Sequence, residues 1–379
     1  MQILKSAFLS ALLVSTSLAA IAADIPPPPS LAVKSYVLMD VNSDNFIAEE
    51  GAGARIEPAS LTKVMTAYLV FKALKNGHLK SDQVLPVSSA AWQSEGSRMF
   101  VEPNRPVTVE ELLHGLIVQS GNDASIVLAE GVAGSEEVFA QLMTKEAKRL
   151  GMSNTNFVNS TGLPHEAHYT TAHDLALLAA ALIHDFPEEY QRHYAVKEYT
   201  YNNITQPNRN RLLWLDPYVD GIKTGHTKSA GYCLMTSAKR GDMRLISVVL
   251  GATSENARAT ESQKLLNYGF QFHESQLVYK AGQAINQLKV WKGSDNTLAA
   301  TVAKDLYITL PKGEYSRVKA KVTSKQPLIA PIKAGDEVGT IDFILDGKVI
   351  DSQKLVAAKN VAIAGFFGRL WDTIRLWFM

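Results

Sequence analysis

Strand-like segments stand on both sides of a helix-rich region, and this order constrains the fold more than any other feature of the chain. Residues 35–50 are typical of two strands joined by a polar turn, while 231–237 and 244–252 are typical of apolar strands around a second turn. The segments between them carry apolar residues at helical spacing, over 60–75, 109–124, 135–150 and 171–184. We therefore expect a sheet made from both ends of this region, with helices packed around it.

The pattern changes beyond this region. Residues 306–310 and 318–322 favour strands, and Asp346-Gly347 between two apolar segments is the signal of a hairpin. We therefore expect a small all-β domain over 277–358, after a larger domain over 24–276. The predicted fold class is α+β.

Residues 1–23 are typical of a cleavable secretory signal. One cation, Lys5, precedes an apolar stretch over 7–18, and small residues follow up to Ala23. The stretch is too short to cross a bilayer, so we expect cleavage after Ala23, with Ala22 as the alternative. Loss of Lys5 from the 38 Lys and Arg leaves them equal in number to the 37 Asp and Glu.

This balance argues against a nucleic-acid partner. Proteins that bind phosphate backbones carry a basic excess or a stripe of Lys and Arg, and the sequence has neither. A single cysteine, Cys233, cannot form a disulfide within the chain, and we expect it to be a small residue of the core.

The C-terminal residues 359–379 predict an amphipathic helix. Apolar side chains gather on one face, whereas Arg369, Asp372 and Arg375 lie on the other, and the segment contains two Trp and three Phe. These charges would be costly inside hydrocarbon, so we expect the helix to lie on a membrane surface and not to cross it. A terminal helix docked on the protein's own core would show the same pattern, but the aromatic residues favour lipid.

Ser60 and Lys63 are the first candidates for chemistry. They are three residues apart at the start of an expected helix and therefore share one face. A desolvated lysine can accept the proton of a serine hydroxyl, and unpaired N–H groups at a helix start can bind an oxyanion. The pair alone is weak evidence, because Ser316 and Lys319 repeat the spacing on an expected strand.

Two later tripeptides give this pair its weight. Ser120-Gly-Asn122 and then Lys223-Thr-Gly225 follow it along the chain. In this order the three motifs are those of serine enzymes that react with penicillin. A Ser-Asp-Asn at 43–45 precedes Ser60 in an expected turn, and we discount it.

With these motifs the chain resembles the low-molecular-mass penicillin-binding proteins of the type of penicillin-binding protein 5 and 6, which are D-alanyl-D-alanine carboxypeptidases. The resemblance covers nearly all of the mature chain and includes 119–123, 208–210 and 220–227. It implies a β-lactamase/transpeptidase-like domain, an antiparallel sheet flanked by helices, followed by the β-domain and the amphipathic helix. Ser125 replaces a cysteine common in close relatives, a departure that concerns thiol reagents and not catalysis.

The resemblance also implies the catalytic roles. Ser60 is acylated by the penultimate D-Ala carbonyl of a peptidoglycan stem pentapeptide, or by a β-lactam, and Lys63 accepts its proton. Ser120 passes a proton to the leaving D-Ala. The backbone N–H groups of Ser60 and His226 form the oxyanion hole.

Eight residues are expected to contact the substrate. The resemblance implies that Asn122 holds the substrate amide, that Lys223 supplies positive potential and that Thr224 binds the terminal carboxylate. Arg209 and Arg258 are candidates to help bind that carboxylate, and Ser97 resembles a serine on a loop beside the family's active site. The expected set is Ser97, Asn122, Arg209, Lys223, Thr224, Gly225, His226 and Arg258.

Other readings of the motifs remain open. A class A β-lactamase shares them, but no Glu-x-x-Leu-Asn element lies between Asn122 and Lys223. An endopeptidase that cuts cross-links, and a penicillin sensor without turnover, are the remaining alternatives. The signal segment favours the periplasm, with attachment to the outer face of the inner membrane through the C-terminal helix.

No metal or other cofactor is expected. His165 and His168 flank Glu166, but no third ligand stands at a fitting spacing, and we interpret both as solvated loop histidines.

Overall fold

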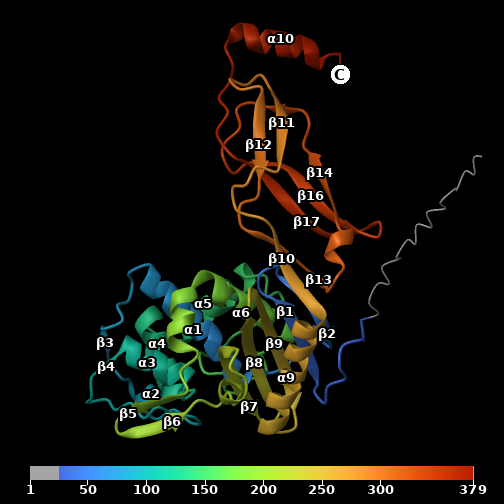
Figure 1. The fold of residues 1–379 in the computed structure, drawn as a ribbon. Coiled ribbons are helices and arrows are strands. Elements are labelled where there is room, and N and C mark those ends of the chain that lie inside the picture. The colour runs from blue at the N-terminus through green and yellow to red at the C-terminus, as the bar shows by residue number, and fades with distance from the viewer. Residues whose placement is uncertain (1–24, 379) are drawn as a thin grey trace, which may run out of the picture.

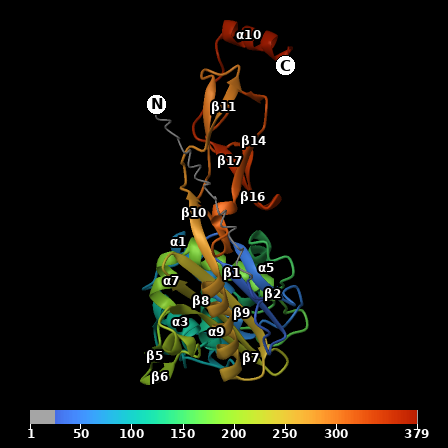
Figure 2. The ribbon, with the colours of Figure 1, turned by 45° about the vertical axis from the view of Figure 1, so that its right-hand side comes forward.

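The computed structural model describes residues 25–378, so the predicted signal segment 1–23 lies outside the described residues (Figure 1). Helices and a sheet form one body, a narrower β-domain extends from it, and a final helix lies at the far end of that β-domain (Figures 1 and 2). The predicted α+β class is confirmed.

The larger body is built on a five-stranded antiparallel sheet in the order β2-β1-β9-β8-β7. Its strands are β1 (Ser35–Asp40), β2 (Asn45–Glu50), β7 (Val219–Thr227), β8 (Gly231–Arg240) and β9 (Met243–Ala252). The N-terminal hairpin joins the later strands because β1 pairs with β9. The expected sheet from both ends of the region is therefore confirmed.

Helices cover both faces of this sheet. In β1, Val37 and Met39 face the core under the main helical layer, whereas Tyr36 and Leu38 face helix α9 (Glu255–Phe272) on the opposite side. The larger layer contains η1 (Ala59–Thr62), α1 (Lys63–Lys75), α2 (Ser89–Trp92), α3 (Val109–Ile117), α4 (Asn122–Ala133), α5 (Glu136–Arg149), α6 (Ala172–Asp185) and α7 (Pro187–His193). The short helix α8 (Leu212–Leu215) packs on the opposite face, in the same hydrophobic cluster as α9. Two small hairpins border it, β3 (Val84–Leu85) with β4 (Val107–Thr108), and β5 (Glu198–Tyr201) with β6 (Ile204–Pro207).

The helix expected over 109–124 is in fact two helices. A capping box between Thr108 and Glu111 starts α3, and α3 ends before Ser120, whose φ of +60° cannot continue a helix. Gly121 then precedes α4, and its N–H bonds the carbonyl of Gly115. The break places Ser120 and Asn122 at the start of a new helix instead of inside a long one.

The β-domain has its own sheet and core. Its six-stranded sheet runs in the order β14-β16-β17-β12-β11-β15, beside the ribbon β10-β13. The bounds are β10 (His273–Tyr279), β11 (Asn286–Trp291), β12 (Thr297–Thr301), β13 (Leu306–Pro311), η2 (Tyr315–Arg317), β14 (Lys319–Ser324), β15 (Leu328–Ile329), β16 (Glu337–Leu345) and β17 (Lys348–Ala357). The predicted hairpin at Asp346-Gly347 is confirmed as the turn between β16 and β17.

The β-domain contacts the larger body through the turn between β1 and β2. The Ser43 hydroxyl lies 2.7 Å from the hydroxyl of Thr309 on β13, and Lys304 forms an ion pair of 2.9 Å with Asp44. Because β10 follows α9 directly, the chain crosses between the bodies without a long linker.

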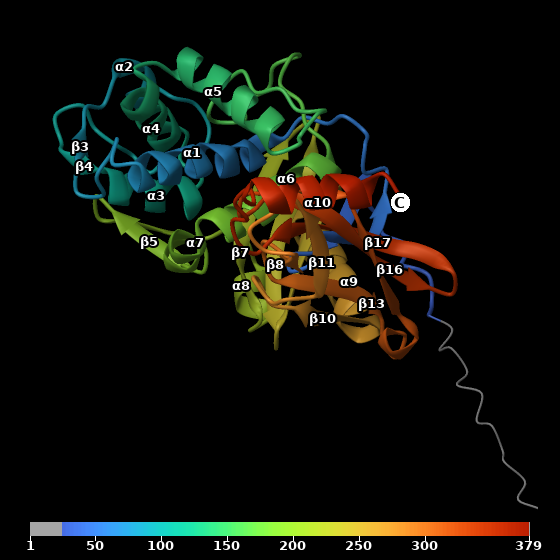
Figure 3. The same cartoon turned by 90° about the horizontal axis from the view of Figure 1, so that it is seen from above.

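Helix α10 (Phe366–Leu376) lies across the far end of the β-domain (Figures 1 and 3). The Asp372 carboxylate accepts the N–H of Lys292 at 2.6 Å, which turns the charged face toward the β-domain. No residue of α10 is buried, and Phe367 and Trp377 are 83% and 86% exposed. The helix therefore does not dock on the protein's own core. Within residues 25–378, no helix combines the length and apolarity needed to cross a bilayer.

Candidate active site

The Ser60 hydroxyl and the Lys63 amine meet at the junction of η1 and α1. The Lys63 Nζ lies 3.3 Å from the Ser60 Oγ, and Lys63 is only 1% exposed. The same Nζ donates to the Asn122 side-chain oxygen and to the Thr161 carbonyl, both at 2.6 Å. Three segments distant in sequence thus converge on one amine.

The protonation of Lys63 follows from this setting. Burial, and after it the charge of Arg209, lower the pKa of Lys63 from 10.5 to about 7, against the opposing charges of Asp123 and Glu136. A neutral amine has two N–H groups and one lone pair. Since the two carbonyl oxygens can only accept, they take the two N–H groups, and the lone pair is left for the Ser60 hydroxyl.

The Ser120-Gly-Asn122 tripeptide lies at the start of α4 and holds a neighbouring loop. Asn122 donates its side-chain amide to the carbonyl of Glu95 at 2.6 Å, and its backbone N–H to the carbonyl of Ser97 at 2.7 Å. Gly96 permits this approach, because a Cβ there would lie 2.9 Å from the Asn122 side-chain nitrogen. Ser97 therefore lies beside Asn122.

The next residue, Asp123, fixes the rest of this loop. Its carboxylate accepts the backbone N–H groups of Met99, Phe100 and Val101 at 3.0, 2.7 and 3.2 Å. Ser120 itself is buried, and within the described residues its hydroxyl forms no hydrogen bond with Lys63 or Lys223.

Lys223-Thr-Gly225 lies on β7, an edge strand that the sequence analysis did not predict. Residues 221–225 are all buried, so the strand lacks the alternation that marks a half-exposed strand. Gly225 lies against η1, since a Cβ there would be 3.2 Å from both the Ala59 Cβ and the Pro58 carbonyl oxygen. This glycine allows β7 to form one wall of the site next to Ser60.

Cations surround this wall. Burial, and then the charges of Lys63, Arg209 and Arg258, lower the pKa of Lys223 well below its usual value. Arg258 is 3% exposed, lies 3.5 Å from the Gly225 carbonyl oxygen, and has its pKa lowered by burial. Arg209 is exposed and close enough to act on both lysines. The site therefore favours an anionic group on its ligand.

His226, at the end of the same strand, is exposed. Its ring stacks on Tyr232 with 4.0 Å between centroids, and its Nδ1 lies 3.0 Å from the carbonyl oxygen of Gly231. These contacts hold the His226 ring in place at the end of β7.

A buried histidine supports the turn that carries Ser60. The N–H of Val158 donates to the Nδ1 of His168 at 3.1 Å, so the Nε2 carries the hydrogen and donates to the Thr62 hydroxyl at 2.8 Å. Burial lowers the pKa of His168 to about 4, which keeps the ring neutral. The interpretation of His168 as a solvated loop residue was wrong; His165 is exposed, as expected.

The Thr161 carbonyl is a site group that sequence reasoning missed. Glu136 accepts the N–H and the hydroxyl of Ser160 at 2.9 and 2.6 Å, and Ser125 donates to the Ser160 carbonyl at 2.7 Å. Gly162, with φ of +87°, packs so tightly that a Cβ would clash with the Ala59 carbonyl. A backbone acceptor leaves no side-chain signal, and only the glycine beside it could have pointed to this turn.

Comparison with known families gives two matches. A family model described as D-alanyl-D-alanine carboxypeptidase matches residues 22–254. A second, described as the C-terminal domain of penicillin-binding protein 5, matches residues 273–362.

Individual relatives agree with these matches. The chain is 46% identical to D-alanyl-D-alanine carboxypeptidase DacC of Escherichia coli K12, over 92% of this chain and 89% of that one. It is 42% identical to DacA of the same organism, over 93% of this chain and 90% of that one. The crystal structure of penicillin binding protein 5 from Haemophilus influenzae matches with a TM-score of 0.84 and 40% identity, covering 89% of this chain and 99% of that one.

Replacing Asp123 with Asn should loosen the loop over 95–101. The neutral amide accepts more weakly, and its NH2 group opposes backbone donors, so we expect a loss of about 1–3 kcal/mol in unfolding free energy. Hydrogen exchange at Met99, Phe100 and Val101 should accelerate. Asp82→Asn, at an exposed position, is the matched control. Unchanged exchange in Asp123→Asn would show that the carboxylate does not hold the loop.

Proposed function

The chain belongs to the D-alanyl-D-alanine carboxypeptidase family of serine peptidases, and from this premise we propose that Ser60 is its nucleophile and Lys63 its general base. The chain is thus a hydrolase, and in this proposal the residues of the three motifs carry out the hydrolysis. The observation that carries the proposal is a buried amine, with a pKa of about 7, lying 3.3 Å from a serine hydroxyl.

Acylation follows from the proton positions. The Lys63 lone pair takes the Ser60 proton while the Oγ attacks the penultimate D-Ala carbonyl carbon. The backbone N–H groups of Ser60 and His226 stabilise the oxyanion. As the C–N bond breaks, the proton on Lys63 passes through the Ser120 hydroxyl to the leaving D-Ala amine, and the peptide is left as an ester on Ser60.

Deacylation uses the same base. Lys63, again neutral, takes a proton from water, and the hydroxide attacks the ester carbonyl. The Ser60 Oγ leaves with the proton from Lys63, which restores the starting state. The sum is one water consumed, one D-alanine released and a peptide shortened by one residue.

The cations on the β7 wall explain a preference for a free C-terminus. A terminal carboxylate placed at Thr224 would lie among Lys223, Arg209 and Arg258. Burial lowers the pKa of Lys223, and the negative charge of the carboxylate raises it again. Lys223 is then protonated and can bind the carboxylate as a cation.

We propose the stem pentapeptide of peptidoglycan as the substrate and β-lactams as acylating inhibitors. Both present a carbonyl for attack and a carboxylate nearby. Residues 24–276 would carry the chemistry, 277–358 would hold it away from the membrane, and 359–379 would attach the chain to the outer face of the inner membrane. The signal segment 1–23 supports export to the periplasm.

Ser60→Ala should abolish release of D-alanine from a peptide ending in D-Ala-D-Ala, since no other hydroxyl can form the ester. The measurement is free D-alanine, together with labelling by fluorescent penicillin. Ser316→Ala, in the exposed second Ser-x-x-Lys, is the matched control and should keep full activity. Wild-type labelling without D-alanine release would support a sensor instead.

The acylation rate should depend on pH through Lys63. Below its pKa of about 7 the amine is protonated and cannot accept the Ser60 proton, so the rate should fall about tenfold per pH unit below that value and level off above it. Stopped-flow acylation by a fluorescent penicillin measures this directly. Lys63→Arg, always charged, should be inactive throughout. A rate that does not vary between about pH 5 and 8 would exclude Lys63 as the base.

Charges on the exposed face of α10 should release the protein from membranes. Replacing both Phe367 and Trp371 with Glu puts two anions where apolar side chains would meet lipid. Cell fractionation should find this variant in the soluble fraction, with hydrolysis of a soluble peptide unchanged. The same change at Val349 and Ile350, exposed on β17, is the control. Retention of the α10 variant on membranes would refute the anchor.

A further inference from the structure

Glu110, His114 and His193 form a compact cluster outside the Ser60 site. Glu110 and His114 are one turn apart on α3, and His193 ends α7. One ligand atom from each residue can be chosen so that all three lie within 4.8 Å of one another. The sequence analysis expected no metal and weighed only His165 and His168; the fold brings His193 beside an unremarkable Glu-x-x-x-His.

The hydrogen bonding of His193 makes this cluster unusual. Its side chain is 0% exposed, and its Nδ1 lies 2.9 Å from the carbonyl oxygen of Glu189, which can only accept. The Nδ1 therefore carries the hydrogen, and in the neutral ring the Nε2 has a lone pair. That Nε2 has no hydrogen-bond partner within the described residues, although the Glu110 Oε1 lies only 3.2 Å away. With a neutral ring, the His193 Nε2 and the Glu110 Oε1 are two acceptors only 3.2 Å apart.

A bound cation resolves this conflict. With zinc–nitrogen and zinc–oxygen bonds of about 2.0–2.2 Å, tetrahedral ligands lie about 3.3–3.5 Å apart. The Glu110 Oε1 lies 3.2 Å from the His193 Nε2 and 3.6 Å from the His114 Nε2. We propose that Glu110, His114 and His193 bind one divalent transition-metal ion, for which Zn²⁺ fits best.

The surroundings of His193 are those of a metal ligand, whereas the buried Nδ1 of His114 has no hydrogen-bond partner among the described residues. The donation from the His193 Nδ1 to a backbone carbonyl is the outer-shell bond that metal-bound imidazoles make. His114 stacks on the ring of Tyr199 with 4.9 Å between centroids, and the ring centroid of His193 lies 5.6 Å from that of Phe71. Both imidazoles are thus held in place before an ion arrives.

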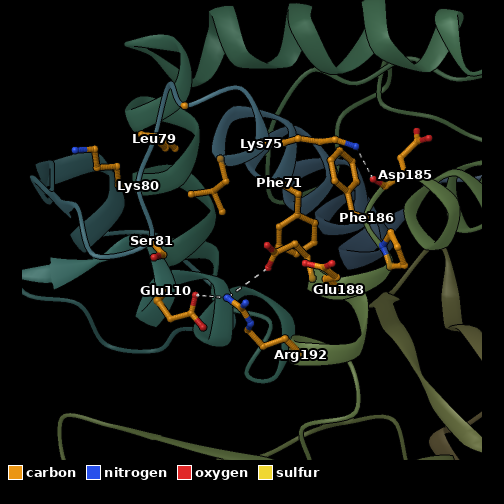
Figure 4. A pocket seen from close by; sticks show the side chains of 14 residues that line it. Phe71, Lys75, Leu79, Lys80, Ser81, Glu110, Asp185, Phe186, Glu188 and Arg192 are labelled. Carbon is orange, nitrogen blue, oxygen red and sulfur yellow. Dashed lines mark hydrogen bonds and ion pairs between the residues drawn. The ribbon is translucent and has the colours of Figure 1, made fainter.

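Charge and access also suit a cation. Glu110 turns its Oε1 to the histidines, whereas its Oε2 lies 4.0 Å from Arg192, so metal binding does not require this contact to break. A second carboxylate, Glu189, lies beside His193. Among the described residues, Arg192 is the one Lys or Arg within 4.0 Å of either carboxylate, so the cluster has a net negative charge when its histidines are neutral. Glu110 and Arg192 line a cavity of about 650 Å³, so the carboxylate of the cluster faces this cavity, whereas neither histidine lines it (Figure 4).

Such an ion would join α3 to α7. Three protein ligands leave the fourth tetrahedral position for water. Because α3 leads directly into Ser120-Gly-Asn122, the ion would brace the element that carries this motif, independently of the chemistry at Ser60.

The test is Zn²⁺ binding to the full chain after chelator treatment and dialysis. Competition with a chromophoric chelator gives affinity, and elemental analysis gives stoichiometry. We expect one Zn²⁺ per wild-type chain, and binding weaker by at least about tenfold in His114→Ala and Glu110→Gln. His78→Ala, at an exposed histidine, should bind as the wild type does. Equal binding by all four proteins, or none by the wild type, would overturn the proposal.

A second readout separates the metal site from a plain ion pair between a protonated His193 and Glu110. Zn²⁺ should raise the thermal midpoint of the wild type and of His78→Ala but not of Glu110→Gln, because an ion that binds only the folded state stabilises it. Co²⁺ should give the visible absorption of a four-coordinate site in the wild type and not in Glu110→Gln. If Glu110→Gln is destabilised and Zn²⁺ moves no midpoint, the ion pair accounts for the cluster and the metal site is refuted.

Discussion

The burial of one lysine amine is the constraint on which the site depends. An ammonium group taken out of water is costly unless acceptors surround it, and the Lys63 amine has only the Asn122 oxygen, the Thr161 carbonyl and the Ser60 hydroxyl. This small set of partners brings its pKa near neutrality. A more polar pocket would hold the proton on the amine and leave Ser60 without a base.

The fold serves this constraint by bringing three segments together at strained or glycine-dependent points. Ser120 adopts a positive φ to end α3, Gly225 lets β7 lie against η1, and Gly96 lets the loop approach Asn122. Ser120 and Gly96 have positive φ, whereas Gly225 keeps strand geometry and makes room only because it lacks a Cβ. Irregular backbone of this kind is common at functional sites, where side chains must be held in particular positions.

The sequence predicted the parts that side-chain pattern controls. Ordered motifs identified Ser60, Lys63 and Asn122 as neighbours, and apolar segments around polar turns predicted the two hairpins from the two ends of the domain. The edge strand β7 was not predicted, because its motif residues are buried on both faces. Helices α3 and α4 were predicted as one helix, because the apolar spacing continues across the break between them. His168 and the Thr161 carbonyl escaped for another reason: their roles come from tertiary contacts that no local pattern records.

The Thr161 carbonyl carries a consequence for how this enzyme tolerates change. Any amino acid at that position presents the same oxygen, and the buried Thr161 side chain serves the turn instead, donating to the Asn159 side-chain oxygen and accepting the N–H of Leu163. The choice of amino acid is more restricted at Gly162, because any Cβ there would clash with the Ala59 carbonyl and displace the turn. A side-chain substitution at Thr161 therefore tests the turn and not the acceptor, because the atom that accepts from Lys63 belongs to the backbone.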